Sequence, residues 1–145
     1  MAKREHLVFE TRHLPAEVDE LAPDTSEIRL LLRNEQASMV HGSLPPGNVS
    51  LAIRHKTVHE IWYILGGEGE LWRRIERQEE VVHLRAGVAV TIPVGAEFQF
   101  RATSGEPLRF IICVTPPWPG HDEAEAVDAH WPATSTLPHQ REDSN

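Results

Sequence analysis

The sequence has little that would direct the chain out of a reduced, aqueous compartment. It holds one cysteine, Cys113, in 145 residues, so no internal disulfide can form. No stretch reaches the roughly 20 apolar residues of a membrane span, and the charged start of the chain lacks the apolar core of a secretion signal. We therefore expect a soluble, cytoplasmic protein in which Cys113, inside the apolar run 109–114, is a buried and unreactive thiol.

Basic charge is also scarce. Lys and Arg total 14 against 22 Asp and Glu, which gives a formal net charge of −8. Nucleic acids and anionic membranes are bound by basic faces. The densest arginines, Arg73, Arg74 and Arg77, are interspersed with Glu79 and Glu80. The sequence therefore predicts neither a nucleic-acid partner nor a membrane partner.

Short apolar runs separated by proline and glycine fill most of the chain. Runs rich in Val, Ile, Leu and aromatic residues occupy 28–33, 37–44, 49–55, 60–65, 69–74, 80–84, 89–92, 98–102 and 108–115. Short strands at near-regular spacing with turn residues between them predict an all-β sandwich or barrel. Helix is expected only over 16–21 and 123–129. We divide the chain into an amino-terminal extension, 1–27, a barrel, 28–119, and a polar carboxy-terminal tail, 120–145.

A glycine-anchored pattern begins where the third of these runs is introduced. It extends from Gly47 through Ile53, His55 and Glu60 to Gly67, with five, one, four and six residues between successive positions. Glycines at such spacing fit turns that need a positive φ or a close approach of two backbones.

A second pattern follows about twenty residues later. It extends from Gly87 through Pro93 and Gly95 to Phe98, with five, one and two intervening residues. Two such patterns in this order resemble the paired signature motifs of the cupin superfamily, over about residues 28–119. The segments TVHEIWYILGGEGELWR, TIPVGAEFQFR and TPPWPG are similar to those of small single-domain bacterial cupins. The resemblance implies a jelly-roll barrel, or double-stranded β-helix, whose interior holds a metal or a small ligand. It also implies a homodimer, since pairing protects edge strands.

The resemblance places the four metal-ligand positions of the motifs on Ile53, His55, Glu60 and Phe98. Two of these are apolar, so only His55 and Glu60 remain as ligands for a divalent metal such as Zn, Fe, Mn or Ni. Stable sites for these metals usually use three or more protein ligands. His59 is a candidate third ligand, although strand alternation points it away from Glu60.

Without a metal, His55 and Glu60 would form a catalytic acid/base pair in an apolar barrel. Burial would favour the neutral form of the glutamate, and a nearby histidine would oppose that effect. The same two side chains could instead hydrogen-bond each other and only fix the local structure, because buried polar groups are normally paired.

The residues expected to surround a bound molecule are mostly apolar. His41 lies on a strand predicted to line the barrel, and Ile53, Trp62, Phe98 and Phe100 would shape a pocket for a small apolar or aromatic substrate. Three functions therefore stay open: an acid/base enzyme such as an isomerase, cyclase or lyase; a metal-dependent dioxygenase, isomerase or lyase with a non-standard ligand set; and a non-catalytic ligand-binding barrel.

Overall fold

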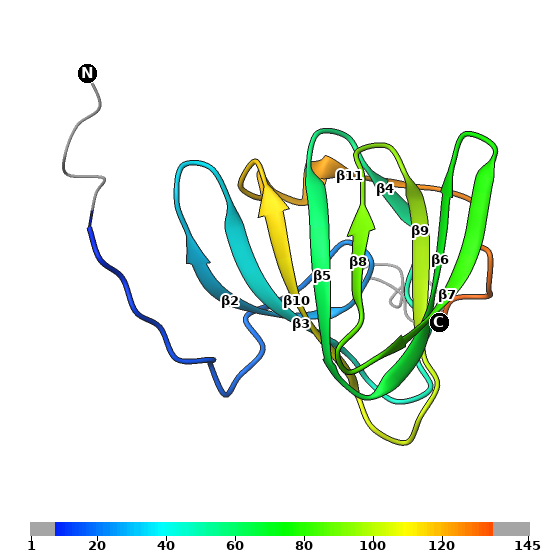
Figure 1. Ribbon diagram of the computed structural model, residues 1–145, viewed down its shortest axis with the longest axis horizontal. Coiled ribbons are helices and arrows are strands. Elements are labelled where there is room, and N and C mark those ends of the chain that lie inside the picture. The colour runs from blue at the N-terminus through cyan, green and yellow to red at the C-terminus, as the bar shows by residue number, and fades with distance from the viewer. Residues whose placement is uncertain (1–7, 135–145) are drawn as a thin grey trace, which may run out of the picture.

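The computed structural model describes residues 8–134 and consists of two antiparallel sheets that face each other (Figure 1). This confirms the all-β prediction. The six-stranded sheet has the order β1 (Glu20–Leu21), β2 (Glu27–Arg33), β3 (Ser38–Leu44), β10 (Leu108–Thr115), β5 (His59–Gly66) and β8 (Ala89–Ile92). The five-stranded sheet has the order β11 (Ala124–Ala126), β4 (Ile53–His55), β9 (Glu97–Ala102), β6 (Glu68–Ile75) and β7 (Gln78–Arg85).

Each predicted strand is present, but both predicted helices are wrong. Residues 16–21 end in β1, and residues 123–129 contain the end of a short 3-10 turn, His121–Glu123, followed by β11. Isolated helices of this length are marginal, so pairing with a neighbouring strand decides the conformation. The predicted strand 49–55 shortens to β4, because Val49 makes only an isolated bridge to Arg101.

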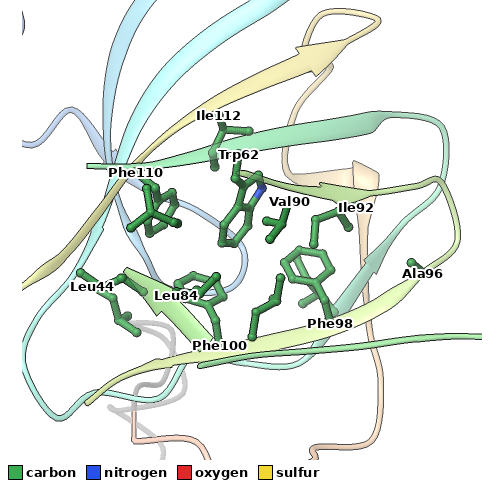
Figure 2. Packing of buried hydrophobic residues seen from close by; sticks show 14 of the residues in the cluster. Leu44, Trp62, Leu84, Val90, Ile92, Ala96, Phe98, Phe100, Phe110 and Ile112 are labelled. Carbon is green, nitrogen blue, oxygen red and sulfur yellow. The ribbon is translucent and has the colours of Figure 1, made fainter. Parts of the chain in front are cut away.

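Strand alternation builds the core. Along β5, side chains alternate strictly from exposed His59 to buried Glu60 and on to buried Ile64. The buried face meets the other sheet around Trp62, whose indole stacks on Phe110 with ring centroids 4.6 Å apart. Figure 2 shows Trp62 at the centre of the cluster of buried hydrophobic residues.

Gly67 is required by the backbone at the turn between β5 and β6. Its φ is +74°, and a Cβ atom there would lie 2.2 Å from the carbonyl oxygen of Pro107. The predicted need for glycine at this motif position is therefore confirmed.

A strap, residues 118–134, runs from one end of the barrel across the five-stranded sheet. Its β11 pairs with β4, placing Ala124 opposite His55. The fully buried Gln99 accepts hydrogen bonds from the backbone N–H groups of His130 and Trp131, at 2.9 and 2.8 Å. The described part of the predicted tail is thus fastened to the barrel, and residues 135–145 lie outside the described residues.

Two expectations from the composition can be compared with the structure. Cys113 is half-buried rather than buried, because it lies on the outward-facing side of β10, opposite the exposed Met39 and Ile61. No helix within residues 8–134 is long and apolar enough to cross a membrane.

Candidate functional site

A cavity of about 610 Å³ opens between the two sheets. Its wall is largely apolar and includes Ile28, Leu30, Val40, Ile112 and Val114. Eleven of the 23 described lining residues are polar or charged: Glu10, Thr11, Arg12, Glu20, Asp24, Ser26, Arg33, Ser38, His55, Glu60 and His121. Both the volume and this composition are typical of sites for small organic molecules.

His55 and Glu60 meet on the wall of this cavity. His55 ends β4 in one sheet, and Glu60 is the second residue of β5 in the other. Nε2 of His55 lies 3.7 Å from Oε2 of Glu60, which is too long for a direct hydrogen bond. Their side chains are only 3% and 7% exposed. The alternative that they merely fix the structure by bonding each other is therefore not supported by this geometry.

The carboxyl group of Glu60 is hydrogen-bonded through only one of its two oxygens. Trp62 donates its Nε1–H to Oε1 at 2.8 Å. Burial raises the pKa of Glu60 from 4.5 to about 8; the bond from Trp62 opposes the rise, while the charges of Asp24 and Glu123 add to it. At neutral pH Glu60 is therefore mainly a protonated acid whose Oε2 can donate a hydrogen bond.

His55 is packed between aromatic rings. The ring centroids of Phe98 and Trp118 lie 5.2 and 5.5 Å from that of His55, both edge to face. Its Nδ1 is buried and has no hydrogen-bond partner among the described residues. Burial lowers the pKa of His55 to about 4, against a smaller opposing effect of Glu123. His55 is therefore neutral at pH 7 and able to accept a proton.

Glu123, which sequence reasoning missed, fastens the strap directly behind this pair. Its carboxylate accepts hydrogen bonds from Thr57 N and Thr57 Oγ1, both at 2.6 Å, and from Val58 N at 2.9 Å. Burial raises the pKa of Glu123, but these bonds outweigh it and the net pKa is lowered. Glu123 is therefore ionised at neutral pH. No sequence pattern signals this role, because the contact spans more than sixty residues.

Asp24 and His121 were also missed. Asp24 is 6% exposed, and its Oδ1 accepts hydrogen bonds from Ser26 N and Oγ at 2.9 and 2.6 Å. Burial raises the pKa of Asp24, while the bonds from Ser26 and the charge of His121 oppose the rise. Thr25 between them has a φ of +79°, the left-handed region. The turn places Asp24 in the cavity wall, and His121 approaches from the strap.

Of the residues predicted to bind substrate, one lies on the cavity wall and the others do not. Ile53 lies on the cavity wall. Trp62, Phe98 and Phe100 lie in the packed core beneath it, each at most 1% exposed, because they interlock with one another and with Phe110. They can shape the floor only through the side chains above them.

His41 is not on the cavity wall either. Val40 lines the cavity, and alternation along β3 turns the next side chain to the other face of the sheet. His41 is 3% exposed, and neither ring nitrogen has a hydrogen-bond partner among residues 8–134. Burial, together with the charges of Arg29 and Arg109, lowers its pKa.

The described residues do not fit a divalent metal. His59 is exposed on the outward-facing side of β5, where its Nδ1 accepts a hydrogen bond from Val94 N at 3.3 Å. Ile53 and Phe98 occupy the other two motif positions. Within residues 8–134, no three His, Cys, Asp or Glu side chains are placed to hold one metal ion. The ligand set of His55, Glu60 and His59 is therefore not brought together.

Comparison with known proteins also identifies a family for this fold. The model of the family described as Cupin domain matches residues 40–115, more than half of the chain. The chain is 27% identical over 124 residues to the uncharacterized protein MJ1618 of Methanocaldococcus jannaschii, covering 79% of this chain and 95% of that protein.

Two solved structures illustrate the shared fold. BH2720 of Bacillus halodurans has a TM-score of 0.59 and 20% identity, covering 65% of this chain and 73% of that one. A predicted oxalate decarboxylase of Thermotoga maritima has a TM-score of 0.54 and 25% identity, covering 62% of this chain and 79% of that one.

Proposed function

The chain belongs to the cupin family, and we propose that it binds a small, mostly apolar molecule in the cavity and transfers a proton on it with Glu60 and His55. One observation carries this proposal. These two side chains, each more than nine-tenths buried, approach to 3.7 Å on the wall of a largely apolar cavity of about 610 Å³. Buried titratable groups with shifted pKa values in a cleft are typical of catalytic sites.

The pair has the protonation states that a proton transfer next to a carbonyl group requires. Neutral His55 removes a proton from the carbon beside the carbonyl, and the C–H electron pair becomes a new C=C bond. The carbonyl π electrons move to oxygen, which takes the proton of Glu60. Where the new C=C bond is conjugated with a second C=C bond of the substrate, His55 returns the proton to the far carbon of that system, the double bond shifts, and the O–H proton returns to Glu60 as the carbonyl re-forms; both groups are then restored. The first motion leaves His55 positive and Glu60 negative, so each stabilises the other's new charge.

The metal-dependent alternative has less support. The described residues supply two of the ligands that such a site needs, and the third candidate faces away. We therefore derive no step through a metal. A binding barrel without catalysis differs from the proposal only in turnover, so the experiment has to separate binding from chemistry.

Deuterium exchange makes that separation. Wild type, His55→Ala and Glu60→Gln are incubated in D₂O with phenylacetone, an apolar ketone with acidic C–H bonds. Mass spectrometry follows deuterium incorporation, and ligand-observed NMR follows binding. We expect exchange above the buffer rate in wild type and a loss of about 10²-fold or more in each variant, with binding retained. Binding without exchange in wild type would leave a non-catalytic barrel and contradict the proposed chemistry.

The pH profile of exchange is a second readout. Burial lowers the pKa of His55 to about 4 and raises that of Glu60 to about 8, so both groups are neutral between these values. We expect kcat/KM to be flat between about pH 4 and 8, to fall below that range as His55 gains a proton, and to fall above it as Glu60 loses one. A maximum confined to the usual range of a free histidine would contradict the assignment.

A further inference from the structure

The inner end of the cavity concentrates carboxyl groups, and the cationic side chain that acts on Asp24 there is the exposed His121. Asp24 and Glu60 both line it, and Glu123 lies near enough for its charge to raise the pKa of Glu60. Among the described lining residues, only Arg12 and Arg33 are arginine or lysine, and both are exposed at the rim. Because Glu60 is mainly protonated at neutral pH, the negative potential at this end comes from Glu123 and from Asp24 in its ionised form.

The two lining carboxyl groups are each fixed by one oxygen, leaving the other oxygen free. Oδ1 of Asp24 takes both hydrogen bonds from Ser26, and Oε1 of Glu60 takes the bond from Trp62. Neither Oδ2 nor Oε2 has a hydrogen bond to any of residues 8–134. Both carboxyl groups are thus oriented by the protein, while each keeps an oxygen for a further partner.

An independent observation also points to a missing partner at this end. His55 lines the cavity and is 3% exposed, yet its side chain makes no hydrogen bond with the described residues. Beside it, the half-buried Trp118 contributes an indole to the wall. Aromatic faces attract ammonium groups, and the attraction grows when water is excluded.

We propose that the molecule bound here carries an ammonium group and that Asp24 is its counter-ion, with the reacting carbonyl placed at Glu60. This inference rests on the proposed function and adds the substrate class to it. A cationic group beside Asp24 would stabilise its ionised form, for which the described lining residues offer only the exposed His121, because a buried charge is stable only when it is paired. An organic cation fits better than a metal ion, since no three-ligand set exists among the described residues. The net charge of −8 would also steer cations toward the protein.

Three probes of nearly equal shape test the charge preference: benzylammonium, benzyl alcohol and benzoate. Each is titrated by ligand-observed NMR into EDTA-dialysed wild type, Asp24→Asn and Asp128→Asn. The last is a control that removes one exposed acid outside the cavity. We expect wild type to bind benzylammonium about tenfold more tightly than benzyl alcohol, as a hydrogen bond to a charged group would give, and benzoate most weakly. The preference should fall to about one in Asp24→Asn and stay in Asp128→Asn.

Each outcome decides the inference. Equal or tighter binding of benzyl alcohol or benzoate to wild type overturns the substrate class but leaves cavity binding intact. A tenfold preference that survives in Asp24→Asn overturns the role of Asp24. Absence of binding by all three probes overturns the cavity proposal itself. The order of the probes on wild type decides the class even if Asp24→Asn does not fold.

Discussion

Replacing Glu60 by glutamine should make the protein more stable, and increasingly so as the pH rises. Burial raises the pKa of Glu60 from 4.5 to about 8, so the folded state binds its proton more tightly than the unfolded chain does. The stability that this proton supplies is present below about pH 4.5 and is lost as the pH rises toward 8. A glutamine carbonyl can still accept the hydrogen bond of Trp62, and the amide has no proton to lose.

The size of the effect follows from the shift. Between these two pKa values, each pH unit changes the free energy of unfolding by up to ~1.4 kcal/mol. Integrated over the titration, ionising Glu60 costs wild type roughly 1 kcal/mol at pH 5 and about 4 kcal/mol at pH 8, as an order of magnitude. Asp24, His55 and Glu123 titrate in both proteins, so their contributions largely cancel in the difference.

Urea unfolding followed by circular dichroism measures this difference. Wild type and Glu60→Gln are compared at pH 5, 6, 7 and 8 at constant ionic strength, with m-values checked for equality. We expect the stability difference to grow steadily in favour of the variant over this range. A difference that stays constant with pH, or a variant less stable than wild type at pH 8, would refute the reasoning that Glu60 is a neutral acid in a dry site.

Two further predictions concern the frame around the site. Glu123→Ala should lower the free energy of unfolding by about 3 kcal/mol, because three hydrogen bonds to a buried carboxylate are lost. Glu125→Ala, two residues along the same strap, removes only an exposed ion pair and should cost less than about 1 kcal/mol; equal losses in urea unfolding would contradict the anchoring role. Gly67→Ala should cost at least ~2 kcal/mol from its positive φ and the Pro107 contact, whereas Gly105→Ala, which has open space, should leave the melting temperature nearly unchanged; similar losses would place the strain elsewhere.

The fold was predictable because its signals are local. Strand alternation, the turn glycines and the two motif spacings are read within windows of about twenty residues. They correctly predicted the strands of the barrel and the meeting of His55 with Glu60. Local signals failed at 16–21 and 123–129, the two short stretches predicted to be helical. Pairing with β4 overrides the helix prediction at 123–129, and nothing in the sequence announces a partner seventy residues away.

The residues that line the cavity were harder to predict from the sequence, because their position also depends on contacts between distant parts of the chain. Trp62, Phe98 and Phe100 are on the inward-facing sides of their strands, as expected. Inward-facing side chains at the centre of the barrel, however, are packed in the core, and only those toward one end line the cavity. Whether an inward-facing residue lines the cavity or is packed in the core depends on contacts between strands that are distant in sequence. Asp24 reaches the wall through an irregular turn, which has no periodicity to read.

The position of Glu123 has a consequence for the order in which the protein is made. Synthesis proceeds from the amino terminus, so β1 to β10 have all been added to the chain before Glu123. Until then the backbone N–H groups of Thr57 and Val58 lack their carboxylate, and His55 lacks the strand that covers it. A chain that ends between β10 and Glu123 therefore contains every strand of the predicted barrel, 28–119, but lacks the contacts that cover His55 and bind the N–H groups of Thr57 and Val58.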